Sequence, residues 1–268
     1  MAFFRIIIPN YNSAKWIDKG LKLIFSQSFP NYVIHIVDDE STDNCMSIIQ
    51  AWRNVYPERL CVHRLPKKSG YPGGTRNYCL HGALFTDNAD YTLFMDSDDW
   101  FCDNQCLQRI YDAAVENNYP DVIRLPFVIL ESEKKRTYVP LKEGTVKDIA
   151  VSPFIAPWTK AIKTEMLVKF PEKTLFEDIP QHIAQLDILE TAAYIDDPVI
   201  VWNRLKENDV SLTANLRTNA EYRKKLDIST WQLLADLYRM ELRHDYSNNA
   251  RNSWIAFAKQ RVKDEGMI

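Results

Sequence analysis

Short apolar runs that alternate with amphipathic segments restrict the fold of this 268-residue chain more than any other feature. Residues 5–8, 32–37, 60–65 and 91–95 are rich in branched and aromatic side chains, as expected of buried strands. The segments between them carry apolar residues at helical spacing or form turns. Strands joined through helices form βαβ units, so the sequence predicts an α/β fold with a mainly parallel central sheet.

Polar side chains follow three of these predicted strands. Residues 10–12, the pair Asp38 and Asp39, and residues 96–99 each stand where an apolar run ends. In parallel α/β sheets, ligands gather beyond the carboxyl ends of the strands. The sequence therefore predicts one shared site at this edge of the sheet.

The segment 96–99 places three carboxylates within four residues. If strand geometry continues, Asp96 and Asp98 point to one side of the sheet. Two unit charges about 4 Å apart repel by roughly 1 kcal/mol in water and roughly 4 kcal/mol near a protein surface, so a bound cation would turn this cost into affinity. Oxygen ligands suit Mg²⁺ or Mn²⁺. The alternative is a turn in which Ser97 or Asp99 caps the next helix.

Composition narrows the class of protein. A formal net charge of −3 with 26% charged residues argues against an electrostatic nucleic-acid binder. No apolar run reaches the roughly 20 residues of a transmembrane helix, and residues 1–9 indicate a strand, not a signal peptide. The five scattered cysteines lack zinc-site pairing and indicate reduced thiols. We expect a cytoplasmic protein, with peripheral association at the inner face of the membrane left open.

The second half of the chain is less regular. Residues 122–131 and 137–141 are expected to pair as strands around the charged turn at 131–136. The remaining expected elements are a loop at 157–160, a helix at 164–169, a helix from 176 to about 191, and a strand at 199–202.

Long helical patterns dominate from residue 219 onward. We therefore expect one domain at residues 1–215, with its two halves at about 1–100 and 101–215, followed by a helical extension at 216–268. The aromatic stripes of this extension favour packing or a homodimer face over a membrane anchor.

Eight motifs together resemble the family 2 glycosyltransferases with the GT-A fold. Four lie in the first half, at residues 6–12, 36–43, 73–77 and 95–99. Four more lie in the second half, at residues 157–160, 176–179, 194–198 and 203–208. The resemblance covers about residues 4–212 and implies transfer of a sugar, with inversion, from a nucleotide diphosphate, usually UDP, to a hydroxyl of a glycan or lipid-linked acceptor in surface polysaccharide or glycan synthesis.

The resemblance also assigns residues to the donor. It places Pro9 and Tyr11 beside the nucleotide, where the Tyr11 ring would stack on the base, although a packed loop tyrosine is an equal alternative. Asp39 would accept a hydrogen bond from the uracil N–H, while Asp38 supports the loop. Arg76 would bind the diphosphate at the start of a helix. The bulkier loop at residues 70–76 departs from the family pattern.

The metal and the base follow from the same resemblance. Asp98 is implied as a direct ligand of Mn²⁺ or Mg²⁺, Asp96 as a ribose contact or supporting ligand, and Asp99 stays open. Asp178 is implied as the base that deprotonates the acceptor, with Glu177 orienting it or acting as the base itself. The alternative is a pair of ordinary acidic residues in the first turn of a helix.

Four basic or polar residues of the second half remain ambiguous. They would close over the diphosphate or bind the acceptor, or else be solvated surface groups: Lys160, Arg204, Lys206 and Asn208.

Three other classes compete with a transferase. A signalling phosphoacceptor domain would carry its acidic pair after the first strand, whereas Asp38 and Asp39 follow the second. A sugar-nucleotide pyrophosphorylase would carry its glycine-rich loop after the first strand, whereas residues 73–76 come later. A non-catalytic carbohydrate- or nucleotide-binding relative is the remaining alternative, and the presence of both Asp98 and Asp178 argues against it.

Overall fold

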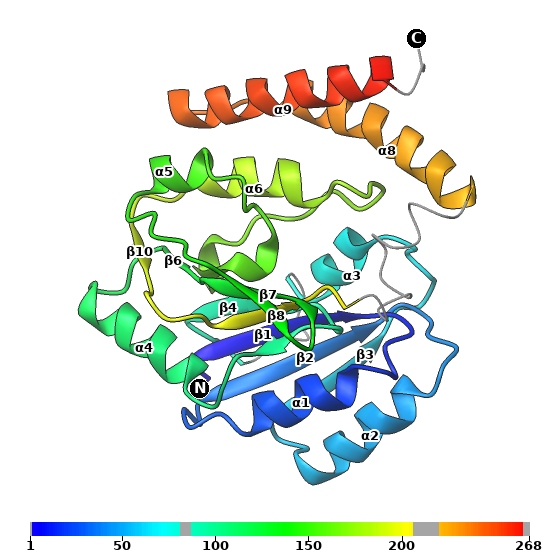
Figure 1. Cartoon of the computed structure of the whole chain (residues 1–268), viewed down its shortest axis with the longest axis vertical. Helices are drawn as coiled ribbons and strands as arrows, with labels where there is room; N and C mark the ends of the chain where they lie inside the picture. Colours follow the sequence, from blue (N-terminus) through cyan, green and yellow to red (C-terminus); the bar gives the residue numbers. More distant parts are fainter. Residues whose placement is uncertain (1, 81–86, 206–219, 265–268) are drawn as a thin grey trace.

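The computed structural model describes residues 2–80, 87–205 and 220–264, with the side chains of 220–223 left aside. Its centre is a seven-stranded sheet in the order β10-β6-β9-β4-β1-β2-β3 (Figure 1). In chain order its strands are β1 (Phe4–Asn10), β2 (Tyr32–Asp38), β3 (Leu60–Arg64), β4 (Tyr91–Phe94), β6 (Val122–Arg124), β9 (Lys160–Lys163) and β10 (Ala192–Tyr194).

The sheet is parallel except for β9. That strand lies antiparallel between β4 and β6, while β1 pairs in parallel with both β2 and β4. The parallel half confirms the expected βαβ pattern. The short strand Lys160–Lys163 was not expected, because its four residues follow a Pro-Trp-Thr turn and lack a long apolar run.

Helices cover both faces of the sheet (Figure 1). One face packs against α1 (Ile17–Phe25), α2 (Cys45–Val55) and α4 (Cys106–Glu116), and the other against α3 (Pro72–Tyr78), α5 (Val146–Ala150) and α6 (Asp178–Leu186). Successive side chains of β1 point to opposite faces of the sheet. Ile6 and Ile8 therefore pack in the apolar core on the α1 face, whereas Ile7 packs in the core on the α3 face.

A second, four-stranded sheet has the order β5-β11-β7-β8. Its strands are β5 (Trp100–Phe101), β7 (Phe127–Ser132), β8 (Lys135–Val139) and β11 (Ile200–Asn203). β7 and β8 pair around the charged turn as expected. However, residues 122–131 do not form one strand, because Pro126 interrupts the run and sends β6 and β7 into different sheets.

The expectation for Asp96 and Asp98 depended on strand geometry through these residues, and that condition is not met; the helix expected at 164–169 was wrong. β4 ends at Phe94, and residues 96–99 form a tight turn in which the backbone N–H of Asp99 donates to the carbonyl of Asp96 at 3.0 Å. Strand alternation therefore does not orient Asp96 and Asp98. The helix expected at 164–169 is a single 3-10 turn, Thr164–Met166, because extended backbone follows it at Leu167.

The helices α8 (Ala220–Arg239) and α9 (Asp245–Asp264) form an outer layer on α5 and α6 (Figure 1). Ile183 of α6 packs in one apolar cluster with Leu233 and Leu237 of α8 and Ala258 of α9. The expected boundary at 215 and 216 lies outside the described residues. Within the part of the chain that the structure describes, no helix is long and apolar enough to span a bilayer.

Candidate active site

The carboxyl ends of β1, β2 and β4 bring the polar clusters together at one edge of the sheet, as the sequence predicts. Asn10 is the register partner of Asp38 on the neighbouring parallel strand, and its side-chain amide donates to the Asp38 carboxylate at 2.8 Å. Asp38 also accepts from the backbone N–H of Ser41 at 3.1 Å. The carboxylate of Asp38 is fully buried and holds the loop that follows β2.

Asp39 organises the loop at residues 66–71. Its two carboxylate oxygens accept from the backbone N–H groups of Ser69 at 2.6 Å and of Gly70 at 2.8 Å. Gly70 has a φ of +69°, a left-handed conformation that glycine adopts without strain. A carboxylate has about four lone-pair positions, so Asp39 retains acceptor capacity beyond these two bonds.

Tyr11 stands exposed beside this loop. Its side chain is 41% exposed, the Lys68 ammonium lies 4.0 Å from its ring centre, and the same ammonium lies 2.8 Å from its hydroxyl oxygen. Pro9, two residues earlier, is half-buried at the end of β1. Tyr11 therefore offers an aromatic surface beside Asp39, with a cation already over the ring.

Arg76 lies at the centre of the site. It belongs to α3, is 4% exposed, and pairs with Asp96 at 2.9 Å and with Glu177 at 2.5 Å. One guanidinium thus joins the turn after β4 to the start of α6, which are far apart in sequence. The sequence predicted Arg76 as a diphosphate ligand and did not predict that it also connects the two acidic clusters.

Two neighbours of Arg76 fix the position of α3. A Cβ on Gly73 would stand 2.1 Å from the carbonyl oxygen of Pro171, so this close approach requires glycine. The Asn77 amide donates to the carbonyl of Phe170 at 2.7 Å and accepts from the Phe170 N–H at 2.8 Å. Both residues stand inside the motif at 73–77. Their roles depend on contacts with residues 170–171, about 95 residues later in the chain, so the motif alone did not indicate them.

The three carboxylates of the turn at 96–99 differ in their exposure. Asp99 is 3% exposed, and its carboxylate accepts from the backbone N–H of Asn203 at 2.8 Å, which ties the turn to β11. Asp96 and Asp98 are half-buried and lie on the more accessible part of the turn. Asp98 and Asp96 are therefore the more accessible carboxylates of this turn, and one oxygen of Asp96 already pairs with Arg76.

Burial raises the pKa of three acids here. Burial, and next the charges of Asp98 and Asp96, hold the pKa of Asp99 well above its usual range. Burial raises the pKa of Glu177 to about 7 although Arg76 opposes it. Burial likewise raises the pKa of Asp178, against the charges of Arg76 and Lys160. The acids at the start of α6 are thus better proton acceptors than solvated carboxylates.

Glu177 and Asp178 stand at the first turn of α6. The Glu177 carboxylate uses one oxygen for Arg76, and its second oxygen has no hydrogen-bond partner among the residues that the structure describes. The Nε of Arg76 is likewise unpaired within those residues. Buried polar atoms of this kind are expected to find their partners in a bound ligand or water.

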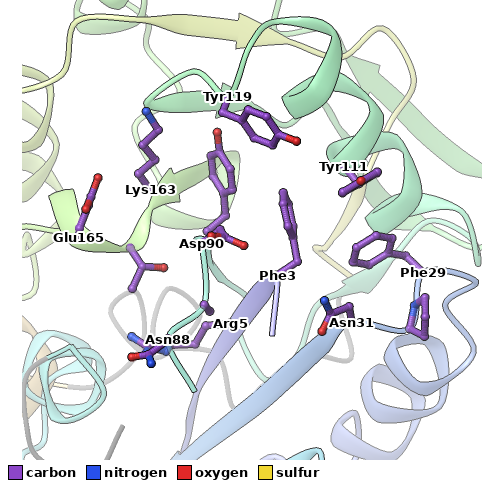
Figure 2. A pocket seen from close by; sticks show the side chains of 14 residues that line it. Phe3, Arg5, Phe29, Asn31, Asn88, Asp90, Tyr111, Tyr119, Lys163 and Glu165 are labelled. Atoms are coloured by element: carbon purple, nitrogen blue, oxygen red, sulfur yellow. The ribbon is translucent and has the colours of Figure 1, made fainter. Parts of the chain in front are cut away.

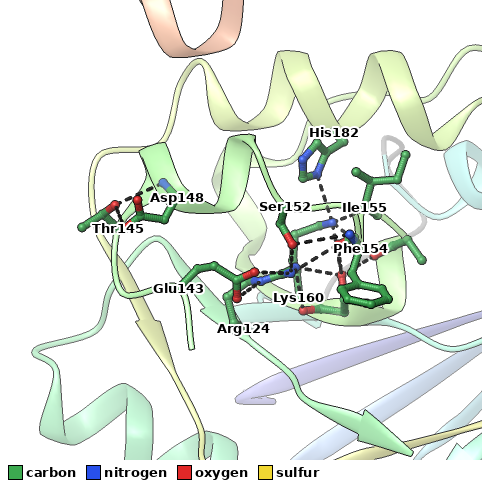
Figure 3. Close-up of polar contacts among 11 residues, drawn as sticks. Arg124, Glu143, Thr145, Asp148, Ser152, Phe154, Ile155, Lys160 and His182 are labelled. Carbon is green, nitrogen blue, oxygen red and sulfur yellow. Dashed lines mark hydrogen bonds and ion pairs between the residues drawn. The ribbon is translucent and has the colours of Figure 1, made fainter. Parts of the chain in front are cut away.

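Lys160 is buried and is not an exposed cation beside Arg76 and the acidic residues. The residue is 1% exposed, and its ammonium donates to the carbonyls of Ile155 at 2.7 Å and Ala156 at 3.1 Å, with His182 Nδ1 at 3.2 Å (Figure 3). Burial, and next the charge of Arg124, hold the pKa of Lys160 well below its usual range. Lys160 therefore supports the segment before β9, an arrangement that the short motif did not reveal.

Arg204 is exposed at the end of β11, where its guanidinium lies 4.8 Å from the ring centre of Trp202. Within the described residues, its contacts are to the second sheet and not to the carboxylates. Lys206 and Asn208 lie outside the described residues.

A cavity of about 920 Å³ lies at the opposite ends of the strands (Figure 2). Phe3, Tyr111, Tyr119 and Lys163 are among the side chains that line it. Because Phe3 precedes β1 and Tyr91 opens β4, this cavity is separate from the carboxylates that follow those strands.

Comparison with known proteins identifies the family. Residues 5–170 match the model of glycosyl transferase family 2. The poly(ribitol-phosphate) β-N-acetylglucosaminyltransferase TarS of Staphylococcus aureus is 34% identical over 125 residues, which are 46% of this chain and 20% of TarS. The dTDP-rhamnosyl transferase RfbG of Shigella flexneri is 28% identical over 81% of this chain and 77% of its own length.

Solved structures show the fold. TarS 1-349 of S. aureus in complex with UDP-GlcNAc superposes with a TM-score of 0.70 at 20% identity, over 95% of this chain and 72% of that one. The mannosyltransferase PcManGT of Pyrobaculum calidifontis in complex with GDP-Man and Mn²⁺ gives a TM-score of 0.63 at 17% identity, over 99% and 75% of the two chains. The chain belongs to glycosyl transferase family 2 and has the GT-A fold.

Proposed function

We propose that this protein transfers a sugar from a UDP-sugar to a hydroxyl of a cell-surface polysaccharide or glycan, with inversion at the anomeric carbon. The observation that carries the proposal is the buried Arg76, which joins the half-buried Asp96 of the 96–99 turn to Glu177 beside Asp178. A donor-binding cluster and a candidate base thereby share one site. The UDP and UDP-GlcNAc complexes of TarS support the choice of donor.

The donor lies along the carboxyl ends of β1, β2 and β4. Tyr11 stacks on the base, Asp39 accepts from the uracil N–H, and Pro9 borders the nucleotide. Arg76 donates to a phosphate oxygen through its unpaired Nε, in addition to its carboxylate partners. Asp98, supported by Asp96, holds Mn²⁺ or Mg²⁺; the paired carboxylate oxygens of this turn suit either ion.

Asp98 and Asp96 would hold a divalent ion, which would supply positive charge opposite the departing diphosphate. Asp178 takes the proton of the acceptor hydroxyl. At the same time the hydroxyl oxygen forms a bond to the anomeric carbon, on the face opposite the leaving UDP. The raised pKa of Asp178 makes it a stronger base than a solvated aspartate. Glu177, fixed by Arg76, orients this first turn of α6.

In the domain division proposed from the sequence, residues 1–215 form the transferase domain, and α8 and α9 belong to the extension at 216–268. The helix α8 exposes Trp231 (46%), Tyr238 (58%) and Ile228 (54%), and the two C-terminal helices are the proposed homodimer face. We place the protein in the cytoplasm, where it meets a glycan or lipid-linked acceptor; peripheral association at the inner face of the membrane stays open.

A donor screen tests the activity. UDP release is measured for a set of UDP-sugars and acceptors with Mn²⁺ or with EDTA, and the anomeric configuration of the product is read by NMR. Metal-dependent release with an inverted product is expected. UDP binding without transfer to any acceptor would favour the non-catalytic relative.

Asp98→Ala tests the metal ligand by isothermal titration of UDP. The wild-type affinity for UDP is expected to rise when Mn²⁺ is added, whereas the variant should bind UDP equally weakly with and without Mn²⁺. An unchanged response to Mn²⁺ in the variant would contradict the role of Asp98.

A further inference from the structure

Two histidines and a cysteine converge on the sheet face that α3 covers. His35 lies on β2, His63 on the edge strand β3, and Cys79 directly after α3. One ligand atom from each lies within 4.8 Å of the other two. The three residues come from separate elements, and none belongs to the proposed donor site.

A carboxylate fixes the orientation of His35. Its Nε2 lies 2.9 Å from an oxygen of Asp87, and the guanidinium Nε of Arg5 donates to the same carboxylate at 2.9 Å. A carboxylate held by arginine stays ionised and accepts a hydrogen bond, so the proton of His35 resides on Nε2 and its Nδ1 lone pair faces His63. A histidine that donates its second nitrogen to a carboxylate is the usual arrangement around a protein-bound metal.

The spacing of the nitrogens is close to that of a metal site. His35 Nδ1 and His63 Nε2 lie 3.1 Å apart, and the ring planes differ by 10°. Zn–N bonds of about 2.0–2.1 Å in tetrahedral geometry separate two nitrogens by roughly 3.3 Å. As arranged here the two nitrogens face each other, so the His63 ring must swing slightly toward Cys79. His63 is half-buried on the edge strand, which leaves room for this movement.

We propose that His35 Nδ1, His63 Nε2 and the Cys79 thiolate bind one Zn²⁺ ion. Two imidazoles and a thiolate are a ligand set that suits zinc and differs from the oxygen ligands of the 96–99 turn. In the metal-free protein, His63 donates from Nε2 to the lone pair of His35 Nδ1. When the ion binds at Nε2, the proton of His63 moves to its Nδ1, and the Cys79 S–H proton leaves to solvent. One proton is therefore released per ion. Burial raises the pKa of the Cys79 thiol, so the ion must drive this deprotonation.

The site would tie α3 to β2 and β3. Cys79 follows Arg76 by three residues, and the backbone N–H of Cys79 donates to the Arg76 carbonyl at 3.2 Å. A zinc ion would therefore hold the helix that carries the central arginine of the donor site. Its role is positional, so it is measurable without any assay of transfer.

Cobalt substitution tests the proposal. Untagged, chelator-treated full-length protein is titrated with Co²⁺. A thiolate-to-cobalt charge-transfer band in the near ultraviolet, saturating at one ion per chain, is expected. Cobalt on carboxylates alone gives no such band, so the readout separates this site from Asp96 and Asp98. Absence of the band in the wild type would overturn the proposal.

Variants identify the ligands. Cys79→Ser is expected to abolish the band, and Asp87→Asn to weaken Co²⁺ binding by about 10–100-fold. The matched controls Cys102→Ser and His244→Ala should retain full binding. Circular dichroism checks that each variant is folded, and Zn²⁺ should raise the Tm of the wild type but not of Cys79→Ser. A band that persists in Cys79→Ser, or that Cys102→Ser removes, would assign the thiolate elsewhere.

Discussion

At the scale of single residues, Arg76 determines whether the two acidic clusters form one site. Replacing it in Arg76→Met leaves Glu177 buried without its cation, and breaking a buried ion pair from one side costs about 3–5 kcal/mol. Urea unfolding should show this loss, whereas Arg53→Met, at an exposed position of α2, should change stability by less than about 0.5 kcal/mol. Equal stability of the two variants would contradict the central position of Arg76.

Gly73 gives a second prediction at this scale. An added methyl group would meet the Pro171 carbonyl at 2.1 Å, so Gly73→Ala must shift α3 and should cost about 1–3 kcal/mol in urea unfolding, with weaker UDP binding. Gly144→Ala is the matched control, since its added methyl group would lie 3.7 Å from Tyr194 in ordinary contact. Wild-type stability of Gly73→Ala would show that the close approach is not required.

At the scale of elements, the start of α6 predicts a pH dependence. The pKa of Glu177 in the folded protein is about 7, above its ordinary 4.5, so the folded state binds a proton more tightly than the unfolded state. The contribution of Glu177 to the free energy of unfolding is therefore full below pH about 4.5, and it is lost as the pH rises to about 7. Glu177→Gln should flatten this part of the stability profile in urea unfolding across pH. An unchanged slope would assign the titration to another group.

The sequence could predict the parallel half of the sheet because each strand there is a local apolar run that ends in polar residues. The same runs located Asp39 and Asp96 at one edge, whereas Arg76 was assigned to the site by the family resemblance. It could not predict β9, whose four residues become a strand only between β4 and β6. Nor could it predict that Lys160 points into the interior, because its acceptors, two backbone carbonyls and His182, become neighbours only in the folded chain.

At the scale of the whole molecule, α8 and α9 add an outer layer whose surface remains partly apolar. If this layer is the dimer face, Trp231→Glu and Tyr238→Glu together should convert a dimer to a monomer in sedimentation equilibrium. Val55→Glu, at a 66% exposed position on α2, should leave the dimer intact. A monomeric wild type would contradict the proposed dimer without affecting the donor site.

Asp178→Asn tests the proposed mechanism most directly, because it removes the basic oxygen and changes little else at the start of α6. Transfer is measured as UDP release with the best donor and acceptor, and UDP binding with Mn²⁺ is measured by isothermal titration. We predict that transfer falls by at least about 100-fold, since a positioned general base contributes roughly 10²–10⁴-fold, while the Kd for UDP changes little. Transfer at the wild-type rate would contradict the assignment of Asp178 as the base.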